Sequence, residues 1–462
     1  MTQNAPESAG NIVKFQISSN FTDYAVELSA GVVDFRYYEN VLTNSVTATA
    51  TCVETGYQAD DKGGASGQQS TVDGLPIRGG ERTDITIEDA YGNELTFEEG
   101  LYVNRLRDVD AGTSKDVYFI DFASREFFAN EQTRVVKRYE GNIGDNVEKI
   151  LKDVLKVTTD IEIDNTAAPY NFIGNDRKPF YICTWLASKS IPEVTTEDGK
   201  SGKGGAAGYL FFQTRDGYHF RSIDKIFTGE PKKKFIFNNS TQLPEGYDAK
   251  VLTYDINSDI DVGKNLMMGM YNNRSIFFDP LVFNYEVRSF PKAEVPQVEG
   301  DIVKKGEEIP TEDEYLEKTQ NAAEEPVGKL IPDEFRQSPT RFMSFITDNG
   351  VMPSGIDSQE QLNNWSEEKA KDNFDVKETM SQSIMRYSQL FTVKTEITIP
   401  GDFTIKAGDV IQCDFPDLSG SEVKDVNPET KGIYMVASVC HRITPTSSNT
   451  SLSLVRDSFG GK

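Results

Sequence analysis

Hydrophobic and polar residues alternate in short runs over the first quarter of the chain, and polar or glycine-rich breaks separate the runs. Alternation with a period of two places one side-chain face in a core and the other toward solvent, as in a β-strand. Short strands at regular spacing are typical of a sandwich or a barrel. We expect strands at 11–17, 25–28, 32–38, 45–53, 83–87, 101–106 and 117–122, and a polar loop at 56–80.

The hydrophobic period becomes helical after position 122. Asp145 has Glu148 three positions on, which resembles a capping box and predicts a helix over 145–155. The apolar residues that define this helix are Val147, Ile150, Leu151, Val154 and Leu155.

Two features follow the predicted helix. The stretch 192–208 is rich in Gly, Ser and Lys, but its Gly-Lys pairs precede a strand-like run and lack the spacing of a phosphate-binding loop, so we predict a solvent-exposed loop. Beyond it, runs at 209–212 and 218–223 flank Asp216-Gly217, which predicts a hairpin.

The second half of the chain repeats this mixture of patterns. Strand-like runs occur at 251–254 and 275–287, a charged and proline-punctuated excursion covers 291–375, and the chain is β again from 394 to its end. Helices are predicted at 339–346 and 360–370, and a better amphipathic one at 376–391.

Two distant parts of the chain resemble each other. Ile77-Arg-Gly-Gly-Glu81 leads into the strand 82–88, as Ile405-Lys-Ala-Gly-Asp409 leads into 410–415. Each then continues into an outward and a returning strand, and we match the exit 121–125 with 455–459. The pattern predicts two similar barrels in one chain.

Together the patterns predict a mainly β (α+β) fold with two similar antiparallel β-barrel domains, a mixed α/β domain and a partly helical insertion. We expect the first barrel at 1–122, the middle domain at 123–243, the second barrel in two pieces at 244–290 and 385–462, and the insertion at 291–384.

Composition excludes several classes of protein. The 462 residues carry 48 Lys and Arg against 73 Asp and Glu, a formal net charge of -25 that disfavours a DNA-reading protein but suits either solubility or a conduit past which a polyanion slides. No apolar run is long enough to span a membrane. The polar amino terminus lacks the features of a secretory signal, so we expect synthesis in the cytoplasm.

Four cysteines, far apart in sequence, are predicted to be free thiols: Cys52, Cys183, Cys413 and Cys440.

The sequence contains no recognisable catalytic motif. His219 and His441 are the only histidines, each lies on a predicted strand, and we interpret both as structural. Oxygen ligands alternate from Asp108 to Asp116, faintly like a calcium loop, but the distal Glu is missing and a hairpin turn is favoured. We therefore predict no catalytic residues, no cofactor-binding residues and no metal ligands.

Two groups of segments resemble a known family. The carboxy-terminal group is Ser383-Ile-Met-Arg-Tyr387, Thr398-Ile-Pro-Gly-Asp402, Lys406-Ala-Gly-Asp409, Lys431-Gly-Ile-Tyr434, His441 and Leu452-Ser-Leu-Val-Arg-Asp-Ser458. The middle-domain group is Phe122-Ala-Ser-Arg-Glu-Phe127, 145–155, Arg177-Lys-Pro-Phe180, Gly208-Tyr-Leu-Phe-Phe212 and Phe220-Arg-Ser-Ile223. Both groups resemble the baseplate hub proteins of contractile-tailed bacteriophages.

The resemblance covers most of the chain apart from about 291–375. It implies a non-enzymatic homotrimer of the tail baseplate, whose duplicated barrels form a pseudo-sixfold ring beneath a sixfold tail tube. The implied partners are two further copies of the chain, the central spike protein below and the tail tube or tube-initiator protein above. The tape-measure protein and the baseplate wedge are further candidates, and DNA passes without specific binding. The implied location is the virion, after assembly in the host cytoplasm.

Two other classes of function stay open from the residues alone. The many Asp and Glu residues allow a carboxylate-dependent cell-wall hydrolase. A glycan-binding tail adhesin is also compatible with a β-rich chain.

Overall fold

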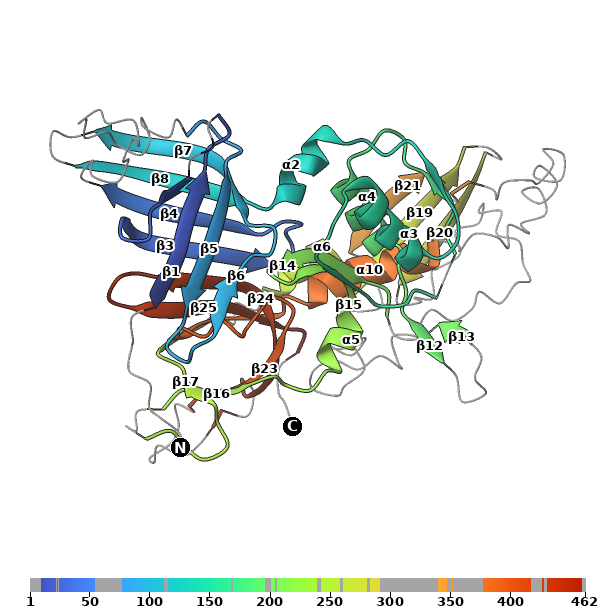
Figure 1. Cartoon of the computed structure of the whole chain (residues 1–462). Helices are drawn as coiled ribbons and strands as arrows, with labels where there is room; N and C mark the ends of the chain where they lie inside the picture. The colour runs from blue at the N-terminus through green and yellow to red at the C-terminus, as the bar shows by residue number, and fades with distance from the viewer. Residues whose placement is uncertain are drawn as a thin grey trace.

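The computed structural model describes residues 10–54, 77–290, 340–351 and 377–458 (Figure 1). Short gaps within these ranges fall at 22, 24, 112–114, 168, 196–200, 204–205, 239–241, 258–260, 281–282, 347–349, 417–425 and 428–429. Strands dominate this part of the chain, and helices gather in its middle. The prediction of a mainly β, α+β fold is therefore confirmed.

Fifteen strands form one large sheet. From the first part of the chain it takes β1 (Asn11–Ser18), β2 (Ala25–Glu27), β3 (Val32–Asn40), β4 (Thr47–Glu54), β5 (Arg82–Glu88), β6 (Glu94–Thr96), β7 (Leu101–Ala111) and β8 (Asp116–Ala123). From the later part it takes β16 (Lys234–Ile236), β17 (Ala249–Lys250), β18 (Thr253–Asn257), β22 (Val393–Pro400), β23 (Val410–Asp414), β24 (Gly432–Ile443) and β25 (Ser448–Arg456). All seven strand runs predicted in the first 122 residues are present.

Eight of these strands form a continuous antiparallel series, which we call the eight-strand run. Its order is β18, β22, β25, β24, β3, β4, β8 and β7. The first and second halves of the sheet meet at its centre, where β3 pairs with β24. The two halves are thus joined edge to edge through their backbones.

Each half of the sheet curls around a hydrophobic core of its own. Phe15, Phe35 and Phe122 lie in the first core, and Ile397, Ile411 and Leu454 lie in the second. In the second half, β17 pairs with β16, whereas β18, which begins three residues after β17 ends, pairs with β22. Strand pairing among the described residues does not close either half into a complete barrel.

The internal repeat predicted from sequence is present in the hydrogen bonds of the two halves. Gly80 N donates to Val103 O, and Val103 N to Glu81 O; Gly408 N donates to Val436 O, and Val436 N to Asp409 O. Both glycines have positive φ, +82° and +84°, which explains why glycine occupies the same place in each turn.

The same strand order and the same β-bulge occur in both halves. The sequence β5, β7, β8, β4, β3 in the first half corresponds to β23, β24, β25, β22, β18 in the second. The register of β7 with β8 shifts between Val103 and Arg105, and that of β24 with β25 between Val436 and Ser438. Phe122 faces Val103 as Leu454 faces Val436, so the exit 121–125 matches 453–457, and the predicted match with 455–459 is wrong by two residues.

The middle of the chain packs its helices against a small sheet above the junction of the halves (Figure 1). Its helices are α2 (Arg125–Gln132), α3 (Ile143–Lys149) with a π-helical turn η1 (Ile150–Val154), α4 (Pro179–Ala187) and α5 (Ile223–Phe227). Its strands are β9 (Arg138–Tyr139), β10 (Asp160–Ile163), β11 (Phe172–Ile173), β14 (Tyr209–Thr214) and β15 (Gly217–Ser222). The predicted helix is confirmed, but it begins at Ile143 rather than at Asp145. Asn142 precedes it and makes no side-chain capping bond.

The predicted hairpin is formed by β14 and β15, with Thr214 opposite Gly217. A Cβ on Gly217 would lie 1.9 Å from Asp160 O, so glycine is required for β10 to approach β15. The stretch 192–208 is not simply a solvent-exposed loop. It contains a short hairpin, β12 (Glu193–Thr195) with β13 (Ser201–Lys203), and its end is anchored where Ala207 N donates to Gln382 Oε1.

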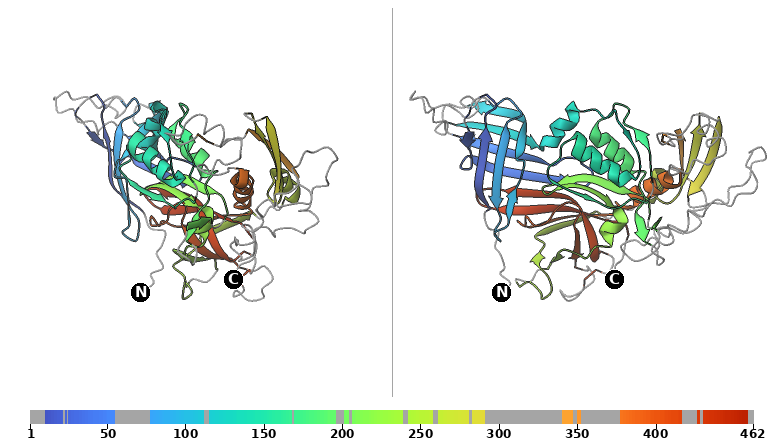
Figure 2. Two further views of the ribbon diagram at one scale, coloured as in Figure 1. Left: turned by 90° about the vertical axis from the view of Figure 1, so that its right-hand side faces the viewer. Right: turned by 45° about the vertical axis from the view of Figure 1, so that its right-hand side comes forward.

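A separate sheet lies at the far end of the molecule from β1 to β8 in all three views (Figures 1 and 2). It consists of β19 (Asn273–Asp279), β20 (Asn284–Phe290) and β21 (Arg341–Ile346), with α6 (Val262–Met268) nearby. The helix predicted at 339–346 is therefore wrong, because this segment pairs in parallel with β19. The run at 275–287, expected in the second barrel, belongs to this sheet.

Helix α10 (Lys377–Gln389) confirms the amphipathic helix predicted at 376–391. It packs between the separate sheet of β19, β20 and β21 and the middle of the chain. Ser381 Oγ lies 2.8 Å from Ser275 Oγ of β19, and Tyr387 Oη donates to Tyr209 O of β14. The helix predicted at 360–370 and most of the loop at 56–80 lie outside the described residues. Among the described helices, none is long and apolar enough to cross a membrane.

Candidate assembly surface

The junction of the two halves is a ladder between segments about four hundred positions apart in sequence. Residues 35–40 of β3 lie opposite 443–438 of β24. Strand β24 is long enough to hold two neighbours on one edge: β23 pairs with its first residues and β3 with its last, while β25 pairs along the other edge. Because β24 pairs with strands of both halves, it holds the two halves together.

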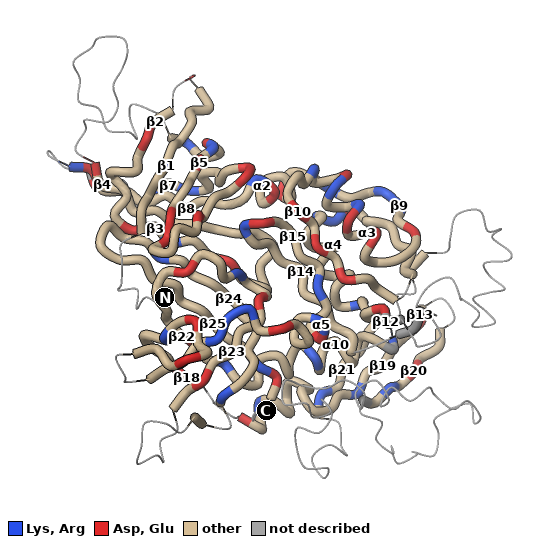
Figure 3. The backbone as a smooth tube through the Cα atoms, turned by 60° about the horizontal axis from the view of Figure 1, so that its bottom comes forward, with Lys and Arg blue, Asp and Glu red and all other residues tan. Residues whose placement is uncertain are grey.

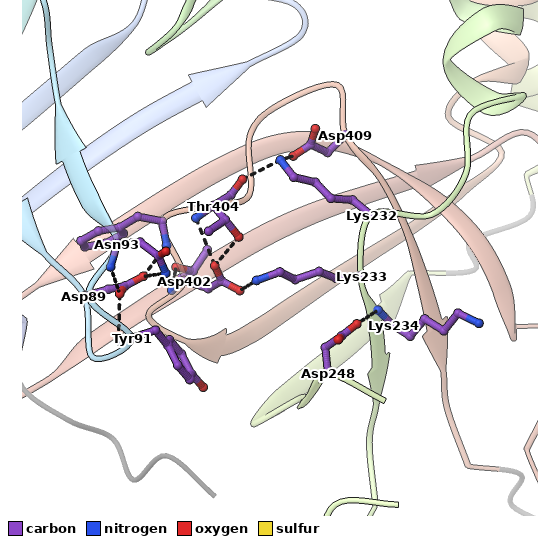
Figure 4. A network of polar contacts seen from close by, with 12 residues as sticks. Asp89, Tyr91, Asn93, Lys232, Lys233, Lys234, Asp248, Asp402, Thr404 and Asp409 are labelled. Carbon is purple, nitrogen blue, oxygen red and sulfur yellow. Dashed lines mark hydrogen bonds and ion pairs between the residues drawn. The ribbon is translucent and has the colours of Figure 1, made fainter. Parts of the chain in front are cut away.

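The second contact between the halves is an aromatic ring of the second half that packs in the core of the first. Phe403 comes from the loop after β22, yet its fully buried side chain belongs to the first core. Its backbone N donates to Asp89 Oδ2 over 3.0 Å, and Asp89 also accepts from Tyr91 N and Asn93 N in the turn before β6 (Figure 4). The carboxylate of Asp89 thereby fixes both the turn and the inserted ring.

Lysines before β16 extend this polar network on the second half (Figure 4). Lys233 Nζ donates to the buried carboxylate of Asp402, and Lys232 Nζ to Asp409 Oδ2 over 2.8 Å. Although burial raises the pKa of Asp402, its bonds with Lys233 and Thr404 outweigh this effect and hold the pKa below the ordinary value. Asp89 of the first half and Lys232 and Lys233 of the second half therefore both hold the loop that carries Phe403.

Glu39 connects three parts of the chain through one buried carboxylate. It lies on β3, is 2% exposed, and accepts hydrogen bonds from Arg215 N of the middle domain and Ala407 N of the second half, over 2.9 and 2.8 Å. Tyr37 Oη donates to the same group over 2.9 Å. Burial raises the pKa of Glu39 despite these donors.

We expect Glu39→Gln to lower the free energy of unfolding by about 1–3 kcal/mol, because an amide offers one acceptor where the carboxylate offers two. It should also change the pH dependence. A carboxyl whose folded pKa is raised favours the folded state below its unfolded pKa, about 4.5, and that contribution declines as pH rises through the folded pKa.

Urea unfolding between pH 4.5 and 7 checks this expectation, since the decline should be absent in E39Q. Glu396→Gln, on the exposed face of β22, is the matched control and should alter stability by less than about 0.5 kcal/mol. Equal effects of the two substitutions would contradict the role assigned to Glu39.

His441 lies at the same junction and is fully buried. Its Nδ1 is 2.9 Å from Thr450 Oγ1, and its ring stacks on Tyr37 and meets the edge of Phe403. Burial lowers the pKa of His441 to about 3, with a smaller lowering by Arg215 and an opposing effect of Asp402. These contacts are consistent with a structural role for His441, which stays a prediction.

The outer face of the eight-strand run is polar. Burial alternates along β4 and β25 so that Ala48, Ala50, Leu452 and Leu454 face the cores, while their neighbours face outward. The outward residues of these two strands are Thr47, Thr49, Thr51, Val53, Asn449, Ser451 and Ser453. A shallow hollow on this face is lined by residues of β18, β22, β24 and β25. We call this surface the polar face.

Charges on the polar face are of both signs, as the colours along its strands show in Figure 3, and some of them form ion pairs. Asp34 Oδ1 accepts from Arg442 across the β3–β24 junction over 2.9 Å, and Asp121 Oδ2 accepts from Arg107 over 3.1 Å. The charged residues of this face are Asp34, Arg36, Arg105, Arg107, Asp110, Asp121, Asp255, Lys394, Glu396 and Arg442. The net charge of -25 is therefore not concentrated here.

The other residues singled out in the sequence lie apart from one another. His219 bonds to Thr214 and Glu162 on the middle domain, where the bonds of His219 and Arg221 lower the pKa of Glu162 to about 2. β7 and β8 pair antiparallel up to Ala111 and Asp116, and residues 112–114 of the favoured hairpin turn lie outside the described residues. All four cysteines are free, and Cys413 faces Gly432 rather than Cys440.

Sequence reasoning missed the residues that fasten the junction, Glu39, Asp89 and Phe403. The acidic residues gave no signal beyond being polar residues within or beside apolar strands. Phe403 follows the Pro-Gly-Asp run at 400–402, which was noted only for its resemblance to hub proteins.

No protein-family model and no curated protein matches the sequence. Among solved structures, the chain is similar to the 43 kDa tail protein of prophage MuSo2 from Shewanella oneidensis, with 9% identity over 96% of this chain and 98% of that one, at a TM-score of 0.49. A tail protein from Neisseria meningitidis gives 9% identity over 96% of each chain and a TM-score of 0.48. A prophage tail protein from Listeria monocytogenes gives 9% identity over 95% and 94%, at 0.43.

All three structures are described as tail proteins, the class that the sequence resemblance predicts. Because identity is low and no TM-score among the three reaches 0.5, the functional argument rests on the chain's own duplicated halves.

Proposed function

We propose that this chain is the hub subunit of a phage tail baseplate, a non-enzymatic homotrimer that joins the tail tube to the central spike. The observation that carries the proposal is the duplication: two halves with the same strand order, the same bulge and the same turn hydrogen bonds lie side by side in one sheet. Three copies of such a chain present six equivalent halves. A threefold assembly can thereby meet a sixfold one.

The polar face suits the wall of a channel through which DNA passes. It carries Ser and Thr residues and charges of both signs, several of them in ion pairs, and it has no cluster of unpaired Lys and Arg among the described residues that would retain a polyanion. We assign this face to the lumen, and the middle domain with α10 to the outside, where the spike, the tube and the wedge would dock. The protein would then act in the virion, after assembly in the host cytoplasm.

Light scattering of the purified chain tests the oligomeric state. We expect a mass of three chains, and negative-stain images with six lobes around a central opening. A monomer that persists in the presence of the spike protein from the same tail would contradict the proposal. Release of soluble fragments from purified peptidoglycan by the chain alone would instead favour the hydrolase.

A further inference from the structure

A buried guanidinium lies at one end of the second half, where β25 ends and β22 and β24 begin. Arg456, the last residue of β25, is 0% exposed and lies opposite Val393, the first residue of β22. Its Nη1 donates to Lys431 O over 2.7 Å. Its Nε and Nη2 form no hydrogen bond, and no carboxylate in the described part of the chain forms an ion pair with it. The charge of Arg456 therefore has no counter-ion in contact with it among these residues.

The groups around Arg456 do not replace a counter-ion. Tyr434 lies beside the guanidinium, with its ring centroid 5.7 Å from Cζ, but it is a neutral phenol whose hydroxyl donates to Thr430 O over 2.5 Å. Asp457 attracts the charge of Arg456, but its carboxylate is bonded to Arg386. Burial lowers the pKa of Arg456 in spite of Tyr434 and Asp457. Because a buried charge without a partner costs free energy, an opposite charge is expected at this place.

The two donors that form no hydrogen bond lie on the same edge of the guanidinium. Nε–H and one N–H of Nη2 point in parallel, and this fork fits the two oxygens of a carboxylate. Two hydroxyl oxygens nearby also form no hydrogen bond, Oγ1 of Thr395 and Oγ1 of Thr430. Thr395 is 1% exposed and faces the same core as Arg456, and Tyr434 interacts with both of them. This end of the second half thus holds a charged fork and hydroxyl donors that suit an anion with two oxygens.

The internal repeat shows that the fold itself does not require this group of side chains. In the register set by the two bulges, the first-half equivalents of Arg456, Tyr434 and Thr395 are Ser124, Leu101 and Ala48. None of the three equivalents is charged. The charged fork is therefore a property of the second half alone.

We propose that Arg456 binds a carboxylate from outside the chain through its Nε and Nη2 atoms. The source of such a group is a small organic acid or an acidic residue of a partner protein. A carboxylate is favoured over phosphate, because a chain of net charge -25 repels a dianion more strongly than a monoanion. Thr430 and Lys431 are half-buried, so the fork lies close to the surface at this end. The inference goes beyond the proposed function and does not depend on how many copies assemble.

Thermal unfolding of the full chain in different anions tests the site. At pH 7 and equal ionic strength, sodium acetate at about 200 mM should raise the unfolding midpoint by about 2 °C relative to chloride, because a ligand that binds the folded state stabilises it. Arg456→Lys keeps the charge but lacks the fork, so it should lose this rise. Arg442→Lys is the matched control, at an exposed arginine that pairs with Asp34, and it should keep the rise. No rise with acetate, an undiminished rise in R456K, or a larger rise with phosphate overturns the proposal.

A blocked peptide distinguishes the two sources of the carboxylate. If acetyl-Gly-Asp-Gly-amide gives the same rise at about one tenth of the acetate concentration, the site belongs to an acidic residue of a partner protein. If the peptide is no more potent than acetate, the site belongs to a small acid. The amide analogue acetyl-Gly-Asn-Gly-amide should give no rise, and an equal rise with it would overturn the carboxylate assignment.

A carboxylate introduced into the chain provides a second measurement. Thr395→Asp places one beside Arg456, so this variant should fold and should no longer respond to acetate. Ala48→Asp introduces the same group at the equivalent position of the first half, where the side chain is also 1% exposed and no arginine occupies the corresponding place. Its unfolding midpoint should lie at least about 5 °C below that of T395D. Equal destabilisation by the two substitutions overturns the proposal.

Discussion

Replacing Arg386 with alanine is expected to lower the free energy of unfolding by about 3–5 kcal/mol, since it strands two carboxylates in the interior. The Arg386 side chain on α10 is 1% exposed. Its Nε donates to Asp224 Oδ1 over 3.0 Å and its Nη1 to Asp457 Oδ2 over 2.7 Å. Asp224 belongs to the middle domain and Asp457 follows β25, so one guanidinium holds three segments together.

Burial works against the charge of Arg386, but Asp224 and Asp457 outweigh it and raise the pKa of the guanidinium above its ordinary value. Chemical denaturation at neutral pH measures the loss. Lys152→Ala is the control, because Lys152 forms an exposed helical pair with Glu148 over 2.5 Å and its removal should cost less than about 0.5 kcal/mol. A loss below about 1 kcal/mol for R386A would show that the chain relaxes to solvate the two carboxylates.

Acid is expected to destabilise the junction of the two halves through His441. A histidine whose folded pKa is depressed contributes its full stability above the unfolded pKa of 6.5, and loses it as pH falls toward the folded value of about 3. The loss from this group approaches about 1.4 kcal/mol per pH unit below 6.5. Among the charged groups around it, Asp402 favours protonation and Arg215 opposes it.

The substitution His441→Gln removes the titrating ring. At pH 7 it should destabilise the protein through lost packing against Tyr37 and Phe403, while between pH 6.5 and 4 its stability should fall less steeply than that of the unsubstituted chain. Urea midpoints measured across this range compare the two slopes, and the carboxylates elsewhere contribute equally to both. Parallel slopes would mean that His441 is solvated at low pH without opening the junction.

The sequence revealed the duplication because backbone geometry demanded the same residues twice. Gly80 and Gly408 both need positive φ before a strand, and this requirement survives where side chains have diverged. The match of the exits failed by two residues for a physical reason. A shift of two leaves every side chain on the same face of a strand, so alternation alone cannot detect it.

Elements that depend on distant partners were predicted less well. The segment 341–346 reads as either helix or strand, and it is a strand because β19 pairs with it and Phe345 stacks on Phe277. The helix at 143–154 was recognised because its period is local. Its start was misplaced, since Gly144 N is satisfied by Thr166 Oγ1, a residue outside the helix.

The candidate assembly surface was beyond reach of a single sequence. Its parts are β3 and β24, which lie far apart in the chain, and Glu39 joins Arg215 and Ala407 across 176 and 368 positions. Local pattern gives the strands and their faces, but it does not tell which edges meet.

The long strand β24 also sets the order in which the molecule can be completed during translation. The edge of β3 is made about four hundred residues before its partner, 438–443, leaves the ribosome. Throughout synthesis the nascent first half therefore carries an open strand edge, which is prone to pairing with other chains. Strand β24 covers this edge when it forms. A chain truncated before β24 is therefore expected to aggregate rather than accumulate as a stable half.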